Sequence, residues 1–152
     1  MMKKINAKAY FRDDNPNGIN GVVYFDELYR GTMVTAHIRG LPPFSRNGRI
    51  IGPHGFHIYV NGECTQGKPD NTHLNTGGHY NLERRFNGNY AGDFPVLFSG
   101  NGDVKARFFT DKFYPKDVIG RSVVIHELPD DYETGLSVNS AKKLACAQII
   151  KY

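Results

Sequence analysis

Two histidines and a tyrosine near the middle of the chain carry the side chains best suited to chemistry. Residues 52–59 read GPHGFHIY. In a β-strand, residues two apart share one face, so His57 and Tyr59 should point the same way and Ile58 the opposite way. His54 lies just before them, next to a glycine that can adopt backbone angles other residues avoid. A His-x-Tyr pair on one strand face would supply half of a metal site.

Other potential metal ligands are scattered along the chain. Imidazole and carboxylate groups suit zinc and copper. The candidate set is His57, Tyr59, His73, His79, Asp93 and His126. No short motif such as HExxH joins these residues, so spacing alone favours a solvated or core side chain at each position. His37 is expected to be a surface residue of a strand.

The elements that must position these side chains are strands. Runs with alternating or β-branched and aromatic residues predict strands at 3–12, 19–29, 32–39, 49–60, 94–98, 103–110, 118–126 and 143–151. Residues 61–93 and 127–142 lack sustained periodicity and predict two long loops, which in a compact domain are usually functional. This pattern predicts one all-β domain over residues 1–152, an eight-stranded Greek-key barrel or sandwich.

The composition is typical of a turn-rich β-protein, and the charge limits the classes of partner that we expect. The chain has 152 residues, 39% of them hydrophobic, with 17 Gly and 8 Pro. Its formal charge of +4 involves no Lys/Arg run longer than two. We therefore expect no nucleic-acid partner, although the basic surface could attract a small anion.

Membrane and export signals are not evident in the sequence. No stretch approaches the roughly 18 apolar residues of a membrane span, so we expect no membrane partner. The N-terminal residues MMKKIN are not followed by the apolar segment of a signal peptide. The expected location is therefore the cytoplasm unless a leader has been removed.

Cys64 and Cys146 are the two cysteines of the chain. They are far apart and do not form a CxxC pattern. They could be two unrelated buried thiols, or one disulfide worth about 4 kcal/mol by closing a long loop. Spacing alone favours neither reading.

Six motifs together resemble the copper/zinc superoxide dismutase family. They run from residue 52 almost to the end of the chain, in the family's order and near its spacing. The resemblance is nearest to members from Gram-positive bacteria, through GDFP at 92–95 and PDDY at 129–132. The motifs are GPHGFHI (52–58), CT (64–65), GGHYN (77–81), AGDFPVL (91–97), VIGRSVVIH (118–126) and LAC (144–146).

The resemblance implies an incomplete copper site. The family uses four copper histidines, and His57, His79 and His126 fall on three of them, with His79 at the position that bridges to zinc. The fourth copper position is Tyr59. His54 matches a structural histidine beneath the copper site and is not counted as a ligand.

The resemblance also implies an incomplete zinc site. Asp93 matches the zinc aspartate, but Asn87 and Tyr90 stand where the family has histidines. His73 could substitute, although it is more simply an exposed loop residue. Asp130 matches the aspartate that links the two metal sites.

Two further features follow from the resemblance. Cys64 and Cys146 match the family's intrasubunit disulfide, and Lys143 replaces the arginine that guides superoxide. Lysine keeps the positive charge but loses the planar fork of arginine. Family members are often dimers, so a homodimer is expected.

These departures predict a superoxide dismutase-like protein with a degenerate metal centre and little or no dismutase activity. Tyr59 is the most damaging change, because neutral tyrosine is a poor ligand. Copper would bind weakly or not at all, and zinc is not expected. The alternative is a working copper-dependent dismutase that uses His57, His79 and His126, with Lys143 attracting superoxide. Three histidines could still hold Cu(II), which has the highest affinity for nitrogen ligands among the first-row divalent ions.

Overall fold

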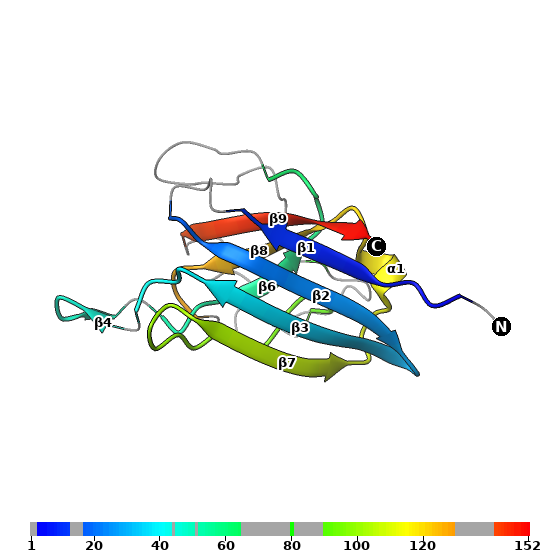
Figure 1. Ribbon diagram of the computed structural model, residues 1–152, viewed down its shortest axis with the longest axis horizontal. Coiled ribbons are helices and arrows are strands. Elements are labelled where there is room, and N and C mark those ends of the chain that lie inside the picture. Colours follow the sequence, from blue (N-terminus) through cyan, green and yellow to red (C-terminus); the bar gives the residue numbers. More distant parts are fainter. Residues whose placement is uncertain are drawn as a thin grey trace.

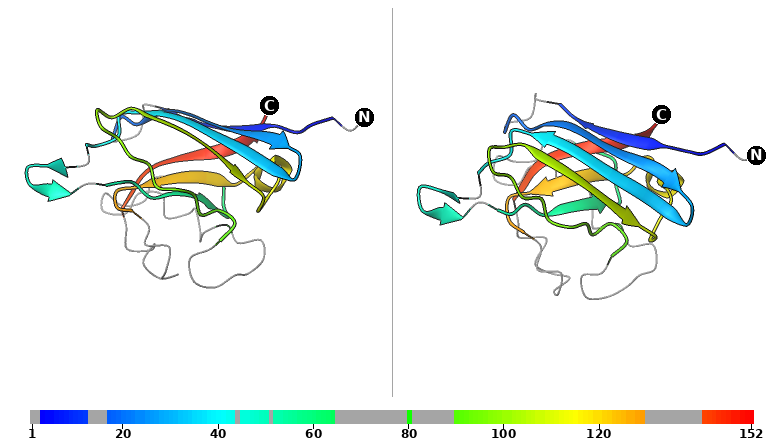
Figure 2. Two further views of the ribbon diagram at one scale, coloured as in Figure 1. Left: turned by 90° about the horizontal axis from the view of Figure 1, so that it is seen from below. Right: turned by 60° about the horizontal axis from the view of Figure 1, so that its bottom comes forward.

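A seven-stranded antiparallel sheet forms the body of the molecule. The computed structural model describes residues 3–12, 17–43, 45–50, 52–64, 80, 90–129 and 142–152. The strands run in the order β6-β8-β9-β1-β2-β3-β7, with β4 and β5 forming a separate hairpin. Figures 1 and 2 show the sheet curled on itself, with β1, β2, β3 and β7 on one side and β9, β8 and β6 on the other. This curled all-β sheet confirms the predicted fold class.

The element bounds follow the predicted strands closely in the first part of the chain. The elements are β1 (Ala7–Phe11), β2 (Asn20–Leu28), β3 (Gly31–Arg39), β4 (Ser45–Arg46), β5 (Arg49–Ile50), β6 (Phe56–Tyr59), β7 (Val104–Thr110), α1 (Pro115–Val118), β8 (Ser122–His126) and β9 (Lys143–Lys151). No helix among the described residues is long and apolar enough to cross a membrane.

The core lies inside the curl of the sheet. In β1, β2 and β3 the alternate residues point inward and are buried, as the period of two requires. Phe25, Ile38, Ile58 and Phe94 are among the fully buried apolar side chains. Burying each such side chain contributes roughly 1.5–3 kcal/mol, so the alternation holds the two sides of the sheet together.

The predicted strand over residues 49–60 was wrong as a single element. It is divided into β5 and β6, and the Gly52–Pro53 peptide bond between them is cis. Proline has no N–H to donate to a sheet and fixes its own φ angle, so a continuous strand is not compatible with Pro53. The motif residue His54 therefore lies before β6, not within it.

The predicted strand over residues 94–98 was also wrong. Asp93 and Leu97 each form an isolated bridge, opposite His57 and His54. The main-chain N–H of Phe94 donates to Phe56 O at 3.2 Å. Pro95 lacks an amide donor, which interrupts the ladder. This segment therefore follows the edge of β6 without becoming a regular strand.

Two shorter differences complete the comparison. The predicted strand over 118–126 begins at Ser122, because Pro115–Val118 forms a one-turn helix. Its first turn is held by the Tyr114 N–H, which donates to Asp117 Oδ2 at 2.8 Å. The β4–β5 hairpin, not predicted, turns at Asn47 and Gly48, both with positive φ.

Candidate metal centre

Strand β6 presents His57 and Tyr59 on one face, as predicted. Phe56 and Ile58 of the same strand belong to the hydrophobic core, so His57 and Tyr59 face the other way. Both are nevertheless buried, with 1% and 0% of their surface exposed. The face of the sheet opposite the core therefore holds an enclosed polar cluster.

His126, at the end of β8, meets Tyr59 across the sheet. Tyr59 Oη and His126 Nε2 are hydrogen-bonded at 2.8 Å. The ring centroids of Tyr59 and His126 are 5.7 Å apart, and those of His57 and His126 are 5.2 Å apart. Two of the three histidines that the resemblance assigns to copper, His57 and His126, are thus brought together, but Nε2 of His126 is hydrogen-bonded to the phenol.

Asp93 fixes the second histidine. The Nδ1–H of His57 donates to Asp93 Oδ1 at 3.2 Å, since an ionised carboxylate only accepts. The main-chain N–H of Tyr90 donates to the other oxygen, Oδ2, at 2.9 Å. The side chains of His57 and Asp93 are only 1% and 4% exposed. The carboxylate is therefore directed at His57 and the Tyr90 main chain, and His57 Nδ1 carries a proton.

His54 is placed to support neighbouring segments through its ring nitrogens. Its Nδ1 is 3.0 Å from the carbonyl oxygen of His126, and its Nε2 is 3.2 Å from that of Pro42. The side chain is 1% exposed. Both ring nitrogens thus face backbone carbonyls, which suits a residue that ties the end of β8 to the segment after β3.

Lys143 places a positive charge beside the cluster. It begins β9 and is the cross-strand neighbour of His126, next to an irregularity in the ladder. Its Nζ lies 4.5 Å from the centroid of the Tyr59 ring, a cation–π contact. Burial lowers the pKa of the Lys143 ammonium below its ordinary value.

The disulfide implied by the resemblance is present. Cys64 and Cys146 are bonded, with their Cα atoms 5.5 Å apart. Cys146 lies in β9 and is paired with Val124 of β8. The bond therefore ties the segment after β6 to the same strands that carry His126 and Lys143.

The remaining residues of the expected centre lie outside the described part of the chain. These are His73, His79, Asn87 and Asp130. Tyr90 is described, and its main chain contacts Asp93.

The described ligand positions are linked to one another by hydrogen bonds. Within those positions, no group of three or more His, Cys, Asp or Glu side chains is arranged to hold a metal. The nitrogen Nε2 of His126 faces Tyr59, and Nδ1 of His57 faces Asp93. For zinc, Asp93 is the only expected ligand that is described, and both its oxygens accept hydrogen bonds.

Sequence reasoning missed the two hydrogen bonds that organise this cluster. The period of two placed His57 and Tyr59 on one face, but it carried no information on which strand would lie opposite. The bond from Tyr59 to His126 spans 67 residues, and that from His57 to Asp93 spans 36. The sequence did contain one chemical signal. Tyr59 and Asp93, at two of the expected ligand positions, can form hydrogen bonds with His126 and His57.

Comparison with known proteins agrees with the fold. Residues 19–149 match the family described as copper/zinc superoxide dismutase (SODC). The chain is 33% identical over 141 residues to superoxide dismutase [Cu-Zn] 3 of Arabidopsis thaliana, covering 86% of this chain and 78% of that protein. It is 30% identical over 151 residues to superoxide dismutase [Cu-Zn] of Deinococcus radiodurans, covering 88% and 78%.

A third relative is longer than this chain. The extracellular superoxide dismutase [Cu-Zn] of Brugia pahangi is 29% identical over 144 residues, covering 88% of this chain and 65% of that protein. The match over residues 19–149 takes in β2 to β9 and every candidate ligand position. The chain belongs to the copper/zinc superoxide dismutase family.

Proposed function

We propose that this chain is a superoxide dismutase-like protein with a degenerate metal centre, which has little or no dismutase activity and serves as a binding or structural protein. One observation carries the proposal: Tyr59 Oη is hydrogen-bonded to His126 Nε2 at 2.8 Å. A residue at a position where the family has a copper histidine thus binds the nitrogen of a neighbouring ligand position.

The chemistry of tyrosine supports a loss of copper affinity. A neutral phenol, with a pKa near 10, is a poor ligand at neutral pH. Copper binding at the Tyr59–His126 pair would have to break the bond between them. His57 Nδ1 is hydrogen-bonded to Asp93, so this imidazole would offer Nε2 to a metal. Copper binding is therefore proposed to be weak, through His57, His79 and His126.

Zinc binding is proposed to be absent. Asn87 and Tyr90 occupy the positions of two zinc histidines in the resemblance, and amide and phenol groups are poor zinc ligands. Asp93 accepts hydrogen bonds from His57 and from the Tyr90 main chain. The chain would thus keep only Asp93 and the bridging His79 of the family's zinc ligands.

A working copper-dependent dismutase is the second candidate. It is favoured by the 5.2 Å separation of the His57 and His126 rings and by the ammonium of Lys143 next to Tyr59. In that case copper would supply the redox chemistry when bound, and Lys143 would attract the superoxide anion. We also propose that the chain belongs with the family members from Gram-positive bacteria, which residues 92–95 and 129–132 support.

Dismutase activity after loading with copper and zinc tests the proposal. We expect the parent protein to stay near background. The triple variant Tyr59→His/Asn87→His/Tyr90→His should gain activity by orders of magnitude, because it restores all three ligand positions. Tyr59→Phe serves as the control, since it removes the hydrogen bond to His126 without adding a ligand. Turnover by the parent that matches the triple variant would overturn the proposal.

A further inference from the structure

The outward face of β1, β2, β3 and β7 carries a cluster of cations that is not part of the metal centre. Alternation places the residues between the buried positions of these strands on the outer surface. The strand register aligns them in rows across the sheet: Tyr10 with Val22, His37 and Lys105, and Lys8 with Tyr24, Thr35 and Arg107. In Figure 1 this side of the sheet faces the viewer.

Positive charge dominates one end of this face, which we call the basic face. Its cations are Lys8, Arg12, Arg39, Lys105 and Arg107. The described carboxylates on this face are Asp103, whose Oδ1 is 3.8 Å from Arg39 Nε, and Asp26, two residues beyond Tyr24 along β2. The side chains of Arg39 and Asp103 are both more than 70% exposed, so this pair is screened and weak. The basic face therefore keeps a net positive potential toward solvent.

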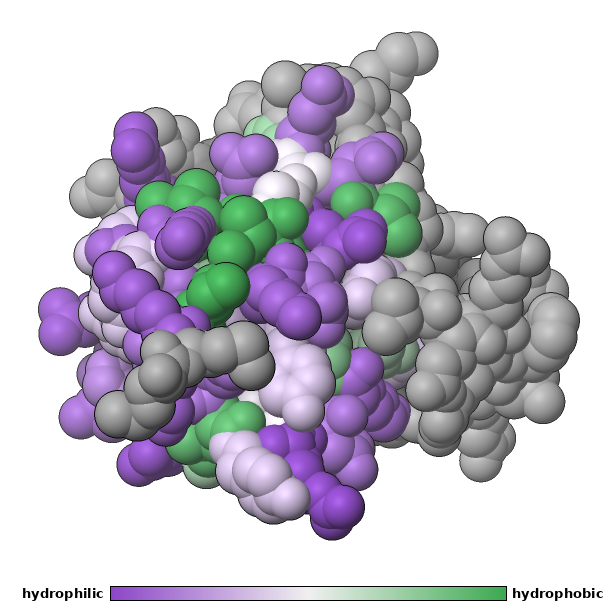
Figure 3. All heavy atoms as spheres, turned by 90° about the vertical axis from the view of Figure 1, so that its right-hand side faces the viewer, coloured by the Kyte–Doolittle hydropathy of each residue, from purple (hydrophilic) through white to green (hydrophobic). Residues whose placement is uncertain are grey.

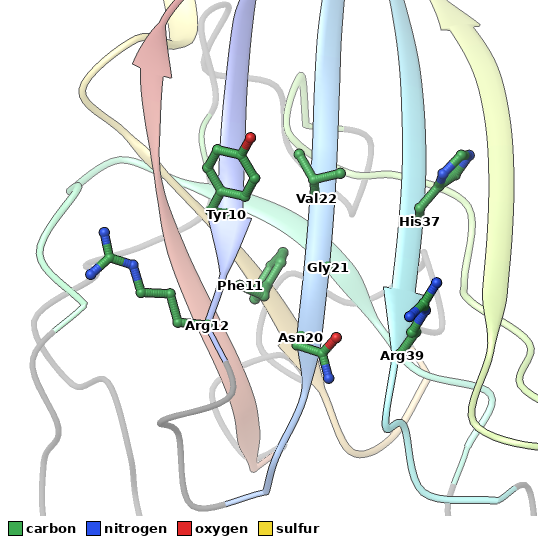
Figure 4. Close-up of a pocket in the computed structure, with 8 residues that line it drawn as sticks. All are labelled: Tyr10, Phe11, Arg12, Asn20, Gly21, Val22, His37 and Arg39. Atoms are coloured by element: carbon green, nitrogen blue, oxygen red, sulfur yellow. The ribbon is translucent and has the colours of Figure 1, made fainter.

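A depression of about 670 Å³ lies within the basic face (Figure 4). It is lined by Tyr10, Phe11, Arg12, Asn20, Gly21, Val22, His37 and Arg39. Figure 4 shows Tyr10, Val22 and His37 in one row and Arg12, Asn20 and Arg39 in the next, with Gly21 between them.

Gly21 allows β2 and β3 to approach closely beneath this depression. Its φ is +139°, and a Cβ at this position would lie 2.1 Å from the carbonyl oxygen of His37. Its neighbours across the ladder, Phe11 and Ile38, are buried. A residue with a side chain at position 21 would therefore displace the backbone of β3.

The extent of the basic face argues against a single small anion as its ligand. Adjacent strands are about 4.8 Å apart, so the cations from β1 to β7 extend over about 14 Å. One phosphate or carboxylate group could not contact the arginines of the depression and also Lys105 and Arg107. The ligand must present several negative charges.

The aromatic side chains favour a protein over a nucleic acid. Bases need exposed ring faces for stacking. Here the Lys8 ammonium lies 4.9 Å from the Tyr10 ring centroid, and the Tyr24 ring lies 5.8 Å from that of Tyr152. Tyrosine and arginine are also the side chains that contribute most to protein–protein interfaces. By contrast, Figure 3 shows only small hydrophobic areas, separated by hydrophilic residues, on the described part of the α1 end.

We propose that the basic face binds an acidic segment of a partner protein, with carboxylates at Arg12, at Arg39 and along Lys105 and Arg107. Each guanidinium can hold a carboxylate through two parallel hydrogen bonds. The Lys8 ammonium donates to Tyr10 Oη at 3.5 Å, which leaves the phenol proton to donate to the partner. The inference does not depend on the state of the metal centre, which lies among β6, β8 and β9.

Fluorescence anisotropy with a labelled oligoglutamate peptide tests this inference. We expect binding by the parent, and a loss of about tenfold or more in affinity for Arg12→Ala/Arg39→Ala. Arg12→Lys/Arg39→Lys keeps the charge but not the fork, and should lose less. Both substituted side chains, Arg12 and Arg39, are at exposed positions. Unchanged thermal unfolding would show that the variants are folded.

Matched controls separate this site from general electrostatic attraction. Lys4→Ala/Lys116→Ala removes the same charge from exposed positions away from the basic face and should leave the affinity nearly unchanged. The inference is overturned if the parent does not bind the peptide, or if the control pair weakens binding as much as the arginine pair. It is also overturned if a single-stranded oligothymidylate of equal charge binds more tightly than the peptide.

Discussion

At the scale of single residues, the replacement at position 59 changes the chemistry of its neighbour as well as its own. Tyr59 is fully buried and its phenol is bonded to His126 Nε2. A buried hydroxyl and a buried imidazole each need a partner, because an unmade hydrogen bond costs about 1–3 kcal/mol. The Tyr59–His126 bond therefore satisfies both buried polar groups.

Substituting Tyr59 tests this coupling directly. Tyr59→His should tighten copper binding by about tenfold or more, because it adds an imidazole ligand and releases His126. Tyr59→Phe releases His126 without adding a ligand, so its copper affinity should rise much less. Competition with a chromophoric chelator measures both affinities. Equal gains in the two variants would contradict a ligand role for position 59.

Tyr80 gives a second prediction at this scale. Its hydroxyl is buried and has no hydrogen-bond partner among the described residues, and the Arg121 guanidinium lies 4.2 Å from its ring centroid. Tyr80→Phe removes the polar atom and keeps the ring contact. The variant should be as stable as the parent or more stable, by about 1 kcal/mol. A clear loss of stability in urea unfolding would show that the hydroxyl has a favourable role.

The same variant should alter the alkaline limit of stability. Burial raises the pKa of Tyr80, with Arg121 opposing the shift. The folded state then holds the proton more tightly than the unfolded state, so stability is present below about pH 10 and is lost as the pH rises further. Tyr80→Phe should lose less stability above pH 10 than the parent. Identical alkaline profiles for the two proteins would contradict this assignment.

At the scale of elements, the sequence predicted the strands well where apolar and polar residues alternate over a long, uninterrupted stretch. The predicted strands at 19–29, 32–39 and 143–151 correspond to β2, β3 and β9 within a residue or two. The predictions failed near Pro53 and Pro95, where the missing amide donors outweigh the apolar pattern. They also failed at 115–118, where a single helical turn is too short to show a period of 3.6.

The candidate site was predictable only in part. The same-face placement of His57 and Tyr59 and the Cys64–Cys146 bond were confirmed, the first from periodicity and the second from family resemblance. The cross-strand partners were not predicted, since pairing between β6 and β8 depends on the whole sheet. Nor did the sequence show the basic face, because its cations are gathered from four strands and form no run in the chain.

Gly21 provides a prediction about strand β2. Gly21→Ala should destabilise the protein by about 2 kcal/mol or more, because the new Cβ would collide with the His37 carbonyl. Gly100→Ala is the matched control, since no atom lies within 4 Å of its Cβ position. That variant should change stability by less than about 0.5 kcal/mol. Similar unfolding midpoints for the two variants would refute the steric account of Gly21.

The disulfide gives a prediction that links two elements. Its cysteines are separated by 82 residues. A loop of this size contributes about 4 kcal/mol by restricting the unfolded chain. Cys64→Ala/Cys146→Ala should therefore unfold at a clearly lower guanidinium concentration than the oxidised parent. The reduced parent should behave like the variant, and no difference from the oxidised protein would contradict this role.

At the scale of the whole molecule, the chain combines a family scaffold with two distinct polar regions. The enclosed cluster of His57, Tyr59, Asp93 and His126 lies on β6, β8 and the segment beside them. The basic face lies on the outside of β1, β2, β3 and β7. Because these regions occupy different sides of the curled sheet, substitutions in one should leave the other unchanged.

The copper content of the loaded protein tests the central claim most directly. The protein would be incubated with excess copper and zinc, dialysed against a weak chelator and measured by elemental analysis. The account predicts well under one copper and one zinc per chain, because Tyr59 replaces a histidine ligand and is hydrogen-bonded to His126 Nε2. One tightly held copper per chain would contradict it and would make the copper-dependent dismutase the better description.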